Sequence, residues 1–330
     1  MSTNQTTKTA LRRLGSSDLR VSPIGLGCWQ FSGGQGGLAG RYWPALDPST
    51  ELQIVRESLA GGITWFDTAE AYGGGNSERA LAWTLHTLEQ RPGSVVVATK
   101  WRPFFRTARS LLTSIDARQQ SLGGYPIDLY QIHAPMSLSS VPAQMRALAS
   151  LLREGKVRQV GVSNFSASQM RRAQAALREE GYALVSNQVR FNLLDRRIED
   201  NGVLEAAREL GMSVIAYSPL AQGLLTGKFH ENPGLLEKLT GPRKWMGSIN
   251  RKRLEETAGL VEELRRIAAA HEVTPAEAAL NWVIRVHGES IVAIPGASKP
   301  SQARLNARAQ SFALSDEEVH RLSDASRRAG

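Results

Sequence analysis

Cysteines, long apolar runs and paired histidines are scarce or missing in this chain, and each shortage removes a class of protein. The only cysteine is Cys28, so an internal disulfide is excluded. It lies in G-L-G-C-W at 25–29, where burial at a strand end is expected rather than catalysis. No run of about 18 apolar residues is present, so no membrane-spanning helix is expected. The opening residues M-S-T-N-Q-T-T-K lack the apolar segment of a secretory signal, which predicts a cytoplasmic location, and residues 1–10 are expected to be disordered.

Histidine is also scarce, with six residues in the chain and no H-x-H pair. A metal-dependent barrel hydrolase needs several His or carboxylate ligands that converge on one ion, so no metal site is predicted. The net charge is +9, but Lys and Arg are scattered along predicted helices and form no basic block. The charge therefore indicates basic helix faces or attraction to a phosphate-bearing ligand, and no nucleic-acid partner is expected.

Short apolar runs alternate with amphipathic stretches along most of the chain. Runs of this kind, bounded by turn residues, are typical of buried parallel strands. The expected strands are 23–29, 63–67, 95–99, 127–132, 157–162, 184–189, 213–217 and 290–294. The expected helices are 49–60, 76–88, 107–122, 142–153, 166–177, 199–210, 251–271, 301–309 and 315–327, with a further helix that begins at 274–275.

Eight strands, almost all followed by helices, favour an α/β fold of the (β/α)8 TIM-barrel class in a single domain spanning 1–330. A doubly wound open sheet stays possible, because periodicity does not give strand order. Residues 11–22 predict an N-terminal hairpin, and the last two helices are additions at the C-terminal end. Two loops are expected at the site, a Gly-rich one at 31–40 and a long Pro- and Gly-containing one at 218–250.

Four functional side chains follow the ends of predicted strands. Asp67, Lys100 and His133 each close an apolar run, and Tyr72 follows Asp67 within the same loop. In parallel α/β folds such residues meet at the carboxyl rim of the sheet. A Lys beside a Tyr favours phenolate, an Asp can hold the Lys, and a His can hydrogen-bond a substrate oxygen. The pattern therefore predicts an acid–base site.

Eight motifs in order resemble the aldo-keto reductase family over about residues 11–328. They are G-L-G-C-W at 25–29, F-D-T-A-E-A-Y-G at 66–73, the strand-ending Lys100, D-L-Y-Q-I-H at 128–133, G-V-S-N-F at 161–165, N-Q at 187–188, Y-S-P-L-A-Q-G-L-L-T-G-K at 217–228 and I-P-G-A-S-K at 294–299. The 217–228 run resembles the bacterial and potassium-channel β-subunit-like branch.

The resemblance implies a reversible reduction of aldehydes or ketones to alcohols, with hydride from nicotinamide C4 and a proton from Tyr72. Lys100 would lower the Tyr72 pKa from its ordinary value near 10, Asp67 would orient Lys100, and His133 would orient the carbonyl. The expected partner is a small carbonyl compound, and no defined oligomer is predicted. An NADPH-binding regulatory protein with little turnover is the alternative, and the complete Asp-Tyr-Lys-His set favours the enzyme.

The resemblance also implies where a nicotinamide cofactor is held. The nicotinamide would be bound by Ser163, Asn164, Gln188 and a stacking Tyr217. The pyrophosphate loop would comprise Ser218, Pro219, Leu220, Gln222, Gly223, Leu225 and Lys228. The adenosine end would be bound by Gly296, Ser298, Lys299, Gln302 and Asn306.

Ser298 and Lys299 could bind a 2′-phosphate, which favours NADPH, although NAD stays possible. The family's Glu-Asn pair is Leu305-Asn306 here, which removes one adenine contact.

Aromatic residues beside the proposed site predict an apolar or aromatic carbonyl substrate. The aromatic residues beside the site are Trp29, Trp101, Phe104 and Phe105, of which Trp29, Trp101 and Phe104 are the substrate candidates. Ordinary packing around the barrel rim would place aromatic residues at the same positions, so both interpretations stand at this point. Arg102 and Arg106 are either solvated or attract an anionic substrate.

Overall fold

The computed structural model describes residues 10–34, 42–239 and 249–329. The disorder expected at 1–10 and most of the Gly-rich loop at 31–40 therefore lie outside the described residues. Residues that precede this gap form a short 3-10 turn, η1 (Trp29–Ser32).

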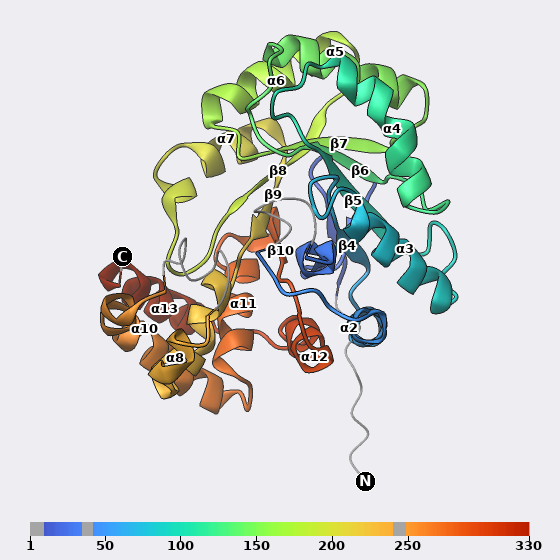
Figure 1. Ribbon diagram of the computed structural model, residues 1–330. Helices are drawn as coiled ribbons and strands as arrows, with labels where there is room; N and C mark the ends of the chain where they lie inside the picture. The colour runs from blue at the N-terminus through green and yellow to red at the C-terminus, as the bar shows by residue number, and fades with distance from the viewer. Residues whose placement is uncertain (1–9, 35–41, 240–248, 330) are drawn as a thin grey trace.

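Eight parallel strands form a barrel, each hydrogen-bonded to its neighbour in sequence (Figure 1). Parallel bridges Ile24–Ala293 and Gly27–Gly296 join the first and last strand edges. This closure confirms the predicted barrel and excludes the doubly wound open sheet. The strands are β3 (Leu26–Gly27), β4 (Trp65–Asp67), β5 (Val96–Trp101), β6 (Leu129–Ile132), β7 (Gln159–Ser163), β8 (Leu184–Arg190), β9 (Ser213–Tyr217) and β10 (Ile291–Ile294).

Helices surround the strands, and their termini carry the expected caps. Capping boxes pair Ser166 with Gln169, Thr274 with Glu277, and Ser315 with Glu318. The helices are α2 (Pro48–Ala60), α3 (Asn76–Thr87), α4 (Arg109–Ser121), α5 (Val141–Arg153), α6 (Ala167–Glu179), α7 (Val203–Leu210), α10 (Arg251–Ala270), α11 (Pro275–Arg285), α12 (Pro300–Arg308) and α13 (Asp316–Arg328). The shorter 3-10 turns are η2 (Arg197–Glu199) and η5 (Gly288–Ser290).

The helix expected over 199–210 is interrupted. The chain forms η2 and then begins α7 after Gly202, whose φ of 80° is a conformation that favours glycine. In the C-terminal part, α10 and α13 pack together outside the ring of barrel helices (Figure 1). None of the helices in the described ranges is long and apolar enough to cross a membrane.

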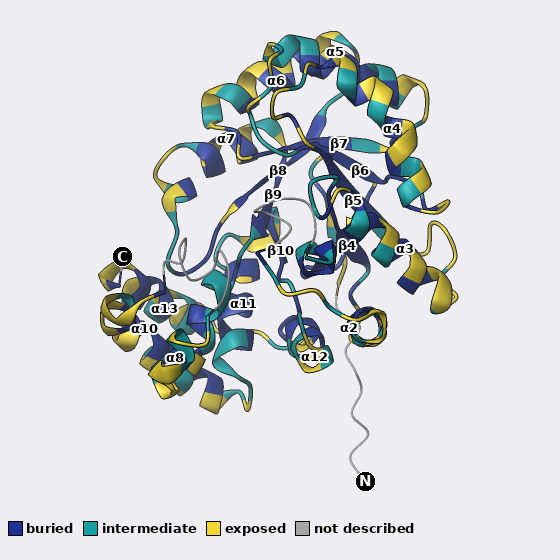
Figure 2. Cartoon of the chain, in the orientation of Figure 1, coloured by how far each residue is buried: buried dark blue, intermediate teal, exposed yellow. Residues whose placement is uncertain are grey.

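The core lies between the strands and the helices. Figure 2 shows the strands almost wholly buried, whereas the helices alternate buried inner faces with exposed outer ones. Alternation along β5 illustrates the pattern, because Lys100 points into the barrel while its neighbours Thr99 and Trp101 point toward the helices.

A two-stranded antiparallel hairpin, β1 (Arg12–Arg13) and β2 (Arg20–Val21), covers the amino ends of the strands. Its side chains form one apolar cluster with residues near the strand starts, namely Leu14, Leu19, Val21, Trp65, Leu129, Val185 and Ile215. At Gly15 a β-carbon would lie 2.2 Å from the carbonyl oxygen of Val185. The hairpin is therefore seated tightly, and the barrel is filled at this end.

The segment after β9 differs from the long loop expected at 218–250. Its described part contains three short helices, η3 (Ala221–Thr226), α8 (Lys228–Glu231) and η4 (Pro233–Leu236). Their apolar side chains form a small cluster of their own with Ile249 and Leu254. Burial of Leu224 and Phe229 thus stabilises short helices in a segment whose Pro and Gly content predicts a loop.

Candidate active site

Lys100 and Asp67 form a fully buried ion pair at the ends of β5 and β4. The Lys100 ammonium also donates a 2.9 Å hydrogen bond to the carbonyl oxygen of Thr68. Burial alone would lower the Lys100 pKa, but the Asp67 carboxylate and Tyr72 outweigh it and raise the pKa above its ordinary value. Lys100 is therefore a fixed positive charge at neutral pH.

The second oxygen of the Asp67 carboxylate accepts two side-chain amides. Gln131 on β6 donates at 3.2 Å and Gln188 on β8 donates at 2.9 Å. With Lys100 on the other oxygen, the buried carboxylate has three donors from three different strands. Its position, and through it that of Lys100, is fixed by the barrel itself.

Tyr72 lies in the turn after β4, with its hydroxyl oxygen 3.4 Å from the Lys100 Nζ. Burial raises the Tyr72 pKa, and the neighbouring Lys100 charge, which acts in the opposite direction, does not cancel that effect. The expectation that Lys100 brings the pKa below its ordinary value is therefore wrong. In this site Tyr72 holds its proton at neutral pH, and Lys100 is placed to stabilise the phenolate once the proton leaves.

His133 follows β6 and meets Tyr72 edge to face, with ring centroids 5.6 Å apart and an 81° angle between the planes. Burial, assisted by the charge of Lys100, lowers the His133 pKa to about 3. The imidazole is therefore neutral. Within the described residues its Nδ1 atom is buried without a hydrogen-bond partner.

Residues expected to hold a nicotinamide are linked by a chain of hydrogen bonds. Tyr217 donates from its hydroxyl to Asn164 at 3.0 Å, and Asn164 donates to Ser163 at 3.0 Å. Ser163 in turn donates to the backbone carbonyl of Gln188 at 2.8 Å. The chain connects the ends of β7, β8 and β9 beside the Asp67 carboxylate.

At the other end of the site, the turn after β10 leads into α12. Gln302 accepts hydrogen bonds from the Ser298 backbone N–H at 2.8 Å and from its hydroxyl at 3.2 Å. Asn306 is almost fully buried and donates to the carbonyl of Gly296 at 3.3 Å. Leu305, where the family has an acid, faces the same cavity.

One cavity of about 1480 Å³ joins these two ends. Lys100 lies beneath it, buried against Asp67. The predicted site residues that line it are Trp29, Asp67, Tyr72, Phe104, His133, Ser163, Asn164, Gln188, Tyr217, Ser218, Pro219, Leu220, Gln222, Gly223, Lys228, Gly296, Ser298, Gln302 and Asn306.

Besides Lys100, three predicted site residues do not line this cavity. Trp101 is fully buried among the helices, where its indole N–H bonds Ser110, because it alternates with the inward Lys100. Its proposed substrate role is therefore wrong. Leu225 is also fully buried, in the main apolar core, and forms no part of the cavity wall. Lys299 is exposed at the start of α12, outside the lining residues.

Several cavity residues were missed by sequence reasoning. Tyr42 and Trp43 extend the aromatic wall, with Tyr42 stacked on Trp29 at 4.8 Å between centroids. Glu70 and Arg118 add a charged wall that is linked to Arg106, since Glu70 accepts from Arg106 at 2.7 Å. Arg106 is thus committed to an internal ion pair. For Glu70 and the two aromatic residues, the available signal was a charged residue or an aromatic pair in a loop after a strand, whereas Arg118 lies within α4.

Backbone strain gathers at the cavity mouth. Asn164, Ser218, Ala221 and Gln222 adopt φ values between 46° and 60°, a region that non-glycine residues seldom occupy. Such conformations cost about 1–3 kcal/mol each and are concentrated at ligand sites. Asn164, Ser218 and Gln222 line the cavity, and two of these three lie in the loop after β9.

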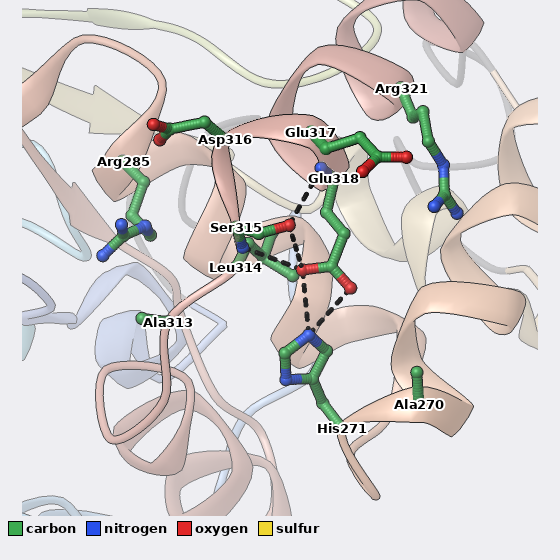
Figure 3. Close-up of a pocket in the computed structure, with 10 residues that line it drawn as sticks. All are labelled: Ala270, His271, Arg285, Ala313, Leu314, Ser315, Asp316, Glu317, Glu318 and Arg321. Atoms are coloured by element: carbon green, nitrogen blue, oxygen red, sulfur yellow. Dashed lines mark hydrogen bonds and ion pairs between the residues drawn. The ribbon is translucent and has the colours of Figure 1, made fainter.

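A second cavity, of about 710 Å³, lies at the start of α13, on the helices outside the barrel (Figure 3). Two of its charged side chains pair with each other, His271 with Glu318 at 2.9 Å. Glu318 also accepts from Ser315 in the capping box, and Arg321 pairs with Glu263. These contacts fasten α13 to α10. In the described parts of the chain, no group of three or more His, Cys, Asp or Glu could hold a metal ion.

Comparison with known proteins agrees with this geometry. The model of the Aldo/keto reductase family matches residues 23–327. An uncharacterized oxidoreductase of Mycobacterium tuberculosis is 39% identical over 312 residues, which cover 93% of this chain and 90% of the relative. The solved glycerol dehydrogenase AKR11B4 from Gluconobacter oxydans superposes with a TM-score of 0.80 at 27% identity, covering 96% of this chain and 94% of that one. A thermostable aldo-keto reductase, Tm1743, gives 0.74 at 26% identity, covering 96% and 99%.

The chain therefore belongs to the aldo/keto reductase family, a class of oxidoreductases that act on carbonyl compounds. The match spans the barrel and the site together. The finer resemblance to the potassium-channel β-subunit-like branch stays a prediction.

Proposed function

We propose that the protein reduces aldehydes or ketones to alcohols with NADPH, reversibly, and that Tyr72 donates the proton. The observation that carries this proposal is the placement of Tyr72 between a buried ammonium, Lys100 at 3.4 Å, and a neutral His133. A bound nicotinamide cofactor would supply the hydride, which no protein side chain can provide.

Tyr72 and the two side chains beside it have separate roles in the proposed reaction. Tyr72 holds its proton because burial raises its pKa, so it is an acid at neutral pH. As the proton moves to the carbonyl oxygen, the Lys100 charge stabilises the phenolate that remains. His133 is neutral, so its ring can orient the carbonyl by a hydrogen bond without adding a competing acid.

The residues present fit a dinucleotide. The cavity carries four cationic side chains, Arg102, Arg118, Arg190 and Lys228, against two carboxylates, Asp67 and Glu70, the first of which is neutralised by Lys100. Ser163, Asn164, Gln188 and Tyr217 would hold the nicotinamide, and the strained loop at 218–228 would cover the pyrophosphate.

A preference for NADPH rests on the turn that opens α12. Ser298 lines the cavity and exposed Lys299 is adjacent, so a hydroxyl and an ammonium are available to a 2′-phosphate at a helix N-terminus. Ser298→Ala and Lys299→Ala should raise KM for NADPH several-fold and leave KM for NADH unchanged. Arg304→Ala is the charge-matched control, because Arg304 lies on the same helix but pairs with Glu57.

The deciding experiment measures oxidation of NADPH and of NADH by the full-length protein with a panel of aldehydes and ketones. We expect turnover with NADPH above that with NADH. Tight NADPH binding without turnover of any carbonyl would favour a regulatory protein instead. No binding of either cofactor would refute the proposal.

A further inference from the structure

Two loops at the carboxyl rim place four large apolar side chains in solvent. These are Phe104, Phe105, Met136 and Leu138, which are 36%, 87%, 60% and 69% exposed. They make up most of the seven large hydrophobic residues exposed on the described surface. We refer to the four as the rim patch. Scattered exposed hydrophobics are ordinary, but a cluster of them beside a binding cavity indicates a contact surface.

Hydrogen bonds hold the two loops together as one surface. The Arg106 carbonyl accepts the Leu138 N–H at 3.0 Å and the Ser137 hydroxyl at 2.9 Å. The Ala108 N–H donates to the Ser139 hydroxyl at 2.9 Å. The loop after β5 and the loop after β6 are thus joined side by side, which places the four apolar residues on one surface.

Phe105 is held in this position against its backbone preference. A hydrogen bond from Arg106 N–H to the Pro103 carbonyl closes a turn in which Phe105 has a φ of 57°. Glycine is the residue that this turn position favours. Phe105 is strained and 87% exposed, so neither its backbone conformation nor its burial stabilises the fold. Strain of this kind is concentrated at binding positions.

The rim patch continues the cavity wall. Phe104 belongs to both, since it lines the cavity and is exposed at its edge. Ala134, two residues before Met136, lines the cavity from the second loop. An extended molecule that has its reacting carbonyl at Tyr72 can therefore leave the cavity along Phe104 and continue over Phe105.

We propose that the rim patch binds the apolar extension of the substrate, which makes the preferred substrates carbonyl compounds with a long hydrocarbon or aryl tail. This inference rests on the proposed carbonyl reduction. A second copy of the chain is the other possible occupant. Four side chains fall far short of the roughly 20–30 residues per side of a standard protein interface, whereas they suit a single chain of carbons.

The test is steady-state kinetics with NADPH and straight-chain aldehydes of increasing length, beside hydroxylated aldehydes of the same length. We expect KM to fall about two- to four-fold per methylene once the chain passes Phe104, without a comparable change for hydroxylated aldehydes. Phe105→Gly and the double variant Met136→Ser/Leu138→Ser should remove this dependence and leave short aldehydes unaffected. Trp83→Ser, at a residue 45% exposed on α3, is the control and should change neither.

Phe105→Gly keeps the test independent of folding. Glycine adopts the positive φ without strain, so this variant should unfold at the same or a higher temperature than the parent. If KM is independent of chain length, or if Phe105→Gly leaves the dependence intact, the rim patch does not bind substrate. A patch variant that changes the oligomeric state in sedimentation, with chain-length dependence intact, would assign the surface to a second copy. Absence of turnover with every aldehyde would refute the proposed function itself.

Discussion

Gln188 donates a 2.9 Å hydrogen bond to Asp67, a residue 121 positions earlier in the chain. The contact crosses the barrel interior and joins a residue at the cofactor end of the site to the carboxylate that holds Lys100. The proposed cofactor site and the proposed acid–base centre thus share one side chain. Gln131 donates to the same oxygen at 3.2 Å, but it does not line the cavity.

This difference between the two amides yields a prediction. Gln188→Leu should raise the dissociation constant of NADPH and lower turnover together, because Gln188 both faces the cavity and supports Asp67. Gln131→Leu removes a similar hydrogen bond, worth about 1–3 kcal/mol of stability for a charged acceptor, and should leave cofactor affinity unchanged. Fluorescence titration with NADPH beside thermal unfolding separates the two effects. Equal loss of cofactor affinity in both variants would contradict this division.

Removal of one hydroxyl tests the assigned acid. Tyr72→Phe should reduce turnover by at least about 100-fold, because a general acid contributes roughly that factor or more, while NADPH affinity is kept. Tyr182→Phe, on a half-buried tyrosine outside the cavity, is the matched control. Stopped-flow single-turnover rates measure the chemical step directly. If Tyr72→Phe reduces a carbonyl at the parent rate, the proton comes from another group.

The neutral state of His133 predicts the shape of the pH profile. Burial and the Lys100 charge lower its pKa to about 3, so its protonation is complete only well below that value and the ring is neutral above about pH 4. The turnover number should therefore show no inflection near the ordinary histidine pKa of about 6.5. His133→Gln should keep the same profile at a reduced rate. A step near pH 6.5 that disappears in His133→Gln would mean that the imidazole titrates there.

Glu51 predicts a pH dependence of stability away from the catalytic centre. Burial and the nearby Asp47 carboxylate raise the Glu51 pKa from 4.5 to about 7, and its side chain is 6% exposed. The Glu51 pKa is higher in the folded state than in the unfolded state, so the protonated carboxyl does not oppose folding below about pH 4.5. As the pH rises from there toward 7, ionisation of Glu51 lowers the free energy of unfolding.

Glu51→Gln should therefore match the parent near pH 4 and exceed it by about 1–3 kcal/mol near pH 8 in urea unfolding. Glu57→Gln on the same helix is the control, because the hydrogen bond from Arg304 lowers the Glu57 pKa and its removal offers no gain. A stability difference for Glu51→Gln that is the same at both pH values would show that the carboxyl is not the cause.

The architecture was largely predictable because its signals are local. Short apolar runs bounded by turn residues located the barrel strands, and Ser or Thr with Glu or Gln three residues later located three helix starts. The convergence of Asp67, Lys100 and His133 followed from one rule, that parallel strands present their carboxyl ends at one rim.

Two kinds of prediction failed. One concerned the direction in which a side chain points, and the other the net result of opposing effects on a pKa. Trp101 follows Lys100 along β5, so strand alternation should have turned it away from the site, whereas proximity in sequence suggested the reverse. The Tyr72 pKa depends on whether burial or the Lys100 charge is larger, and a sequence gives no depth of burial. Gln131 carried a weak signal, a polar residue within an apolar strand, and its contact with Asp67 required the closed barrel.

The hairpin seated under the strands also closes the amino end of the barrel, opposite the cavity at the carboxyl ends of the strands. Leu14, Leu19 and Val21 fill the floor, and Gly15 leaves no gap against Val185. In the reaction proposed above, the alcohol formed at Tyr72 leaves by the route along which the carbonyl arrived, so outgoing and incoming molecules obstruct each other in one passage. Accumulated alcohol should then inhibit the enzyme by occupying that passage. A barrel that was open at its amino end would avoid this product inhibition.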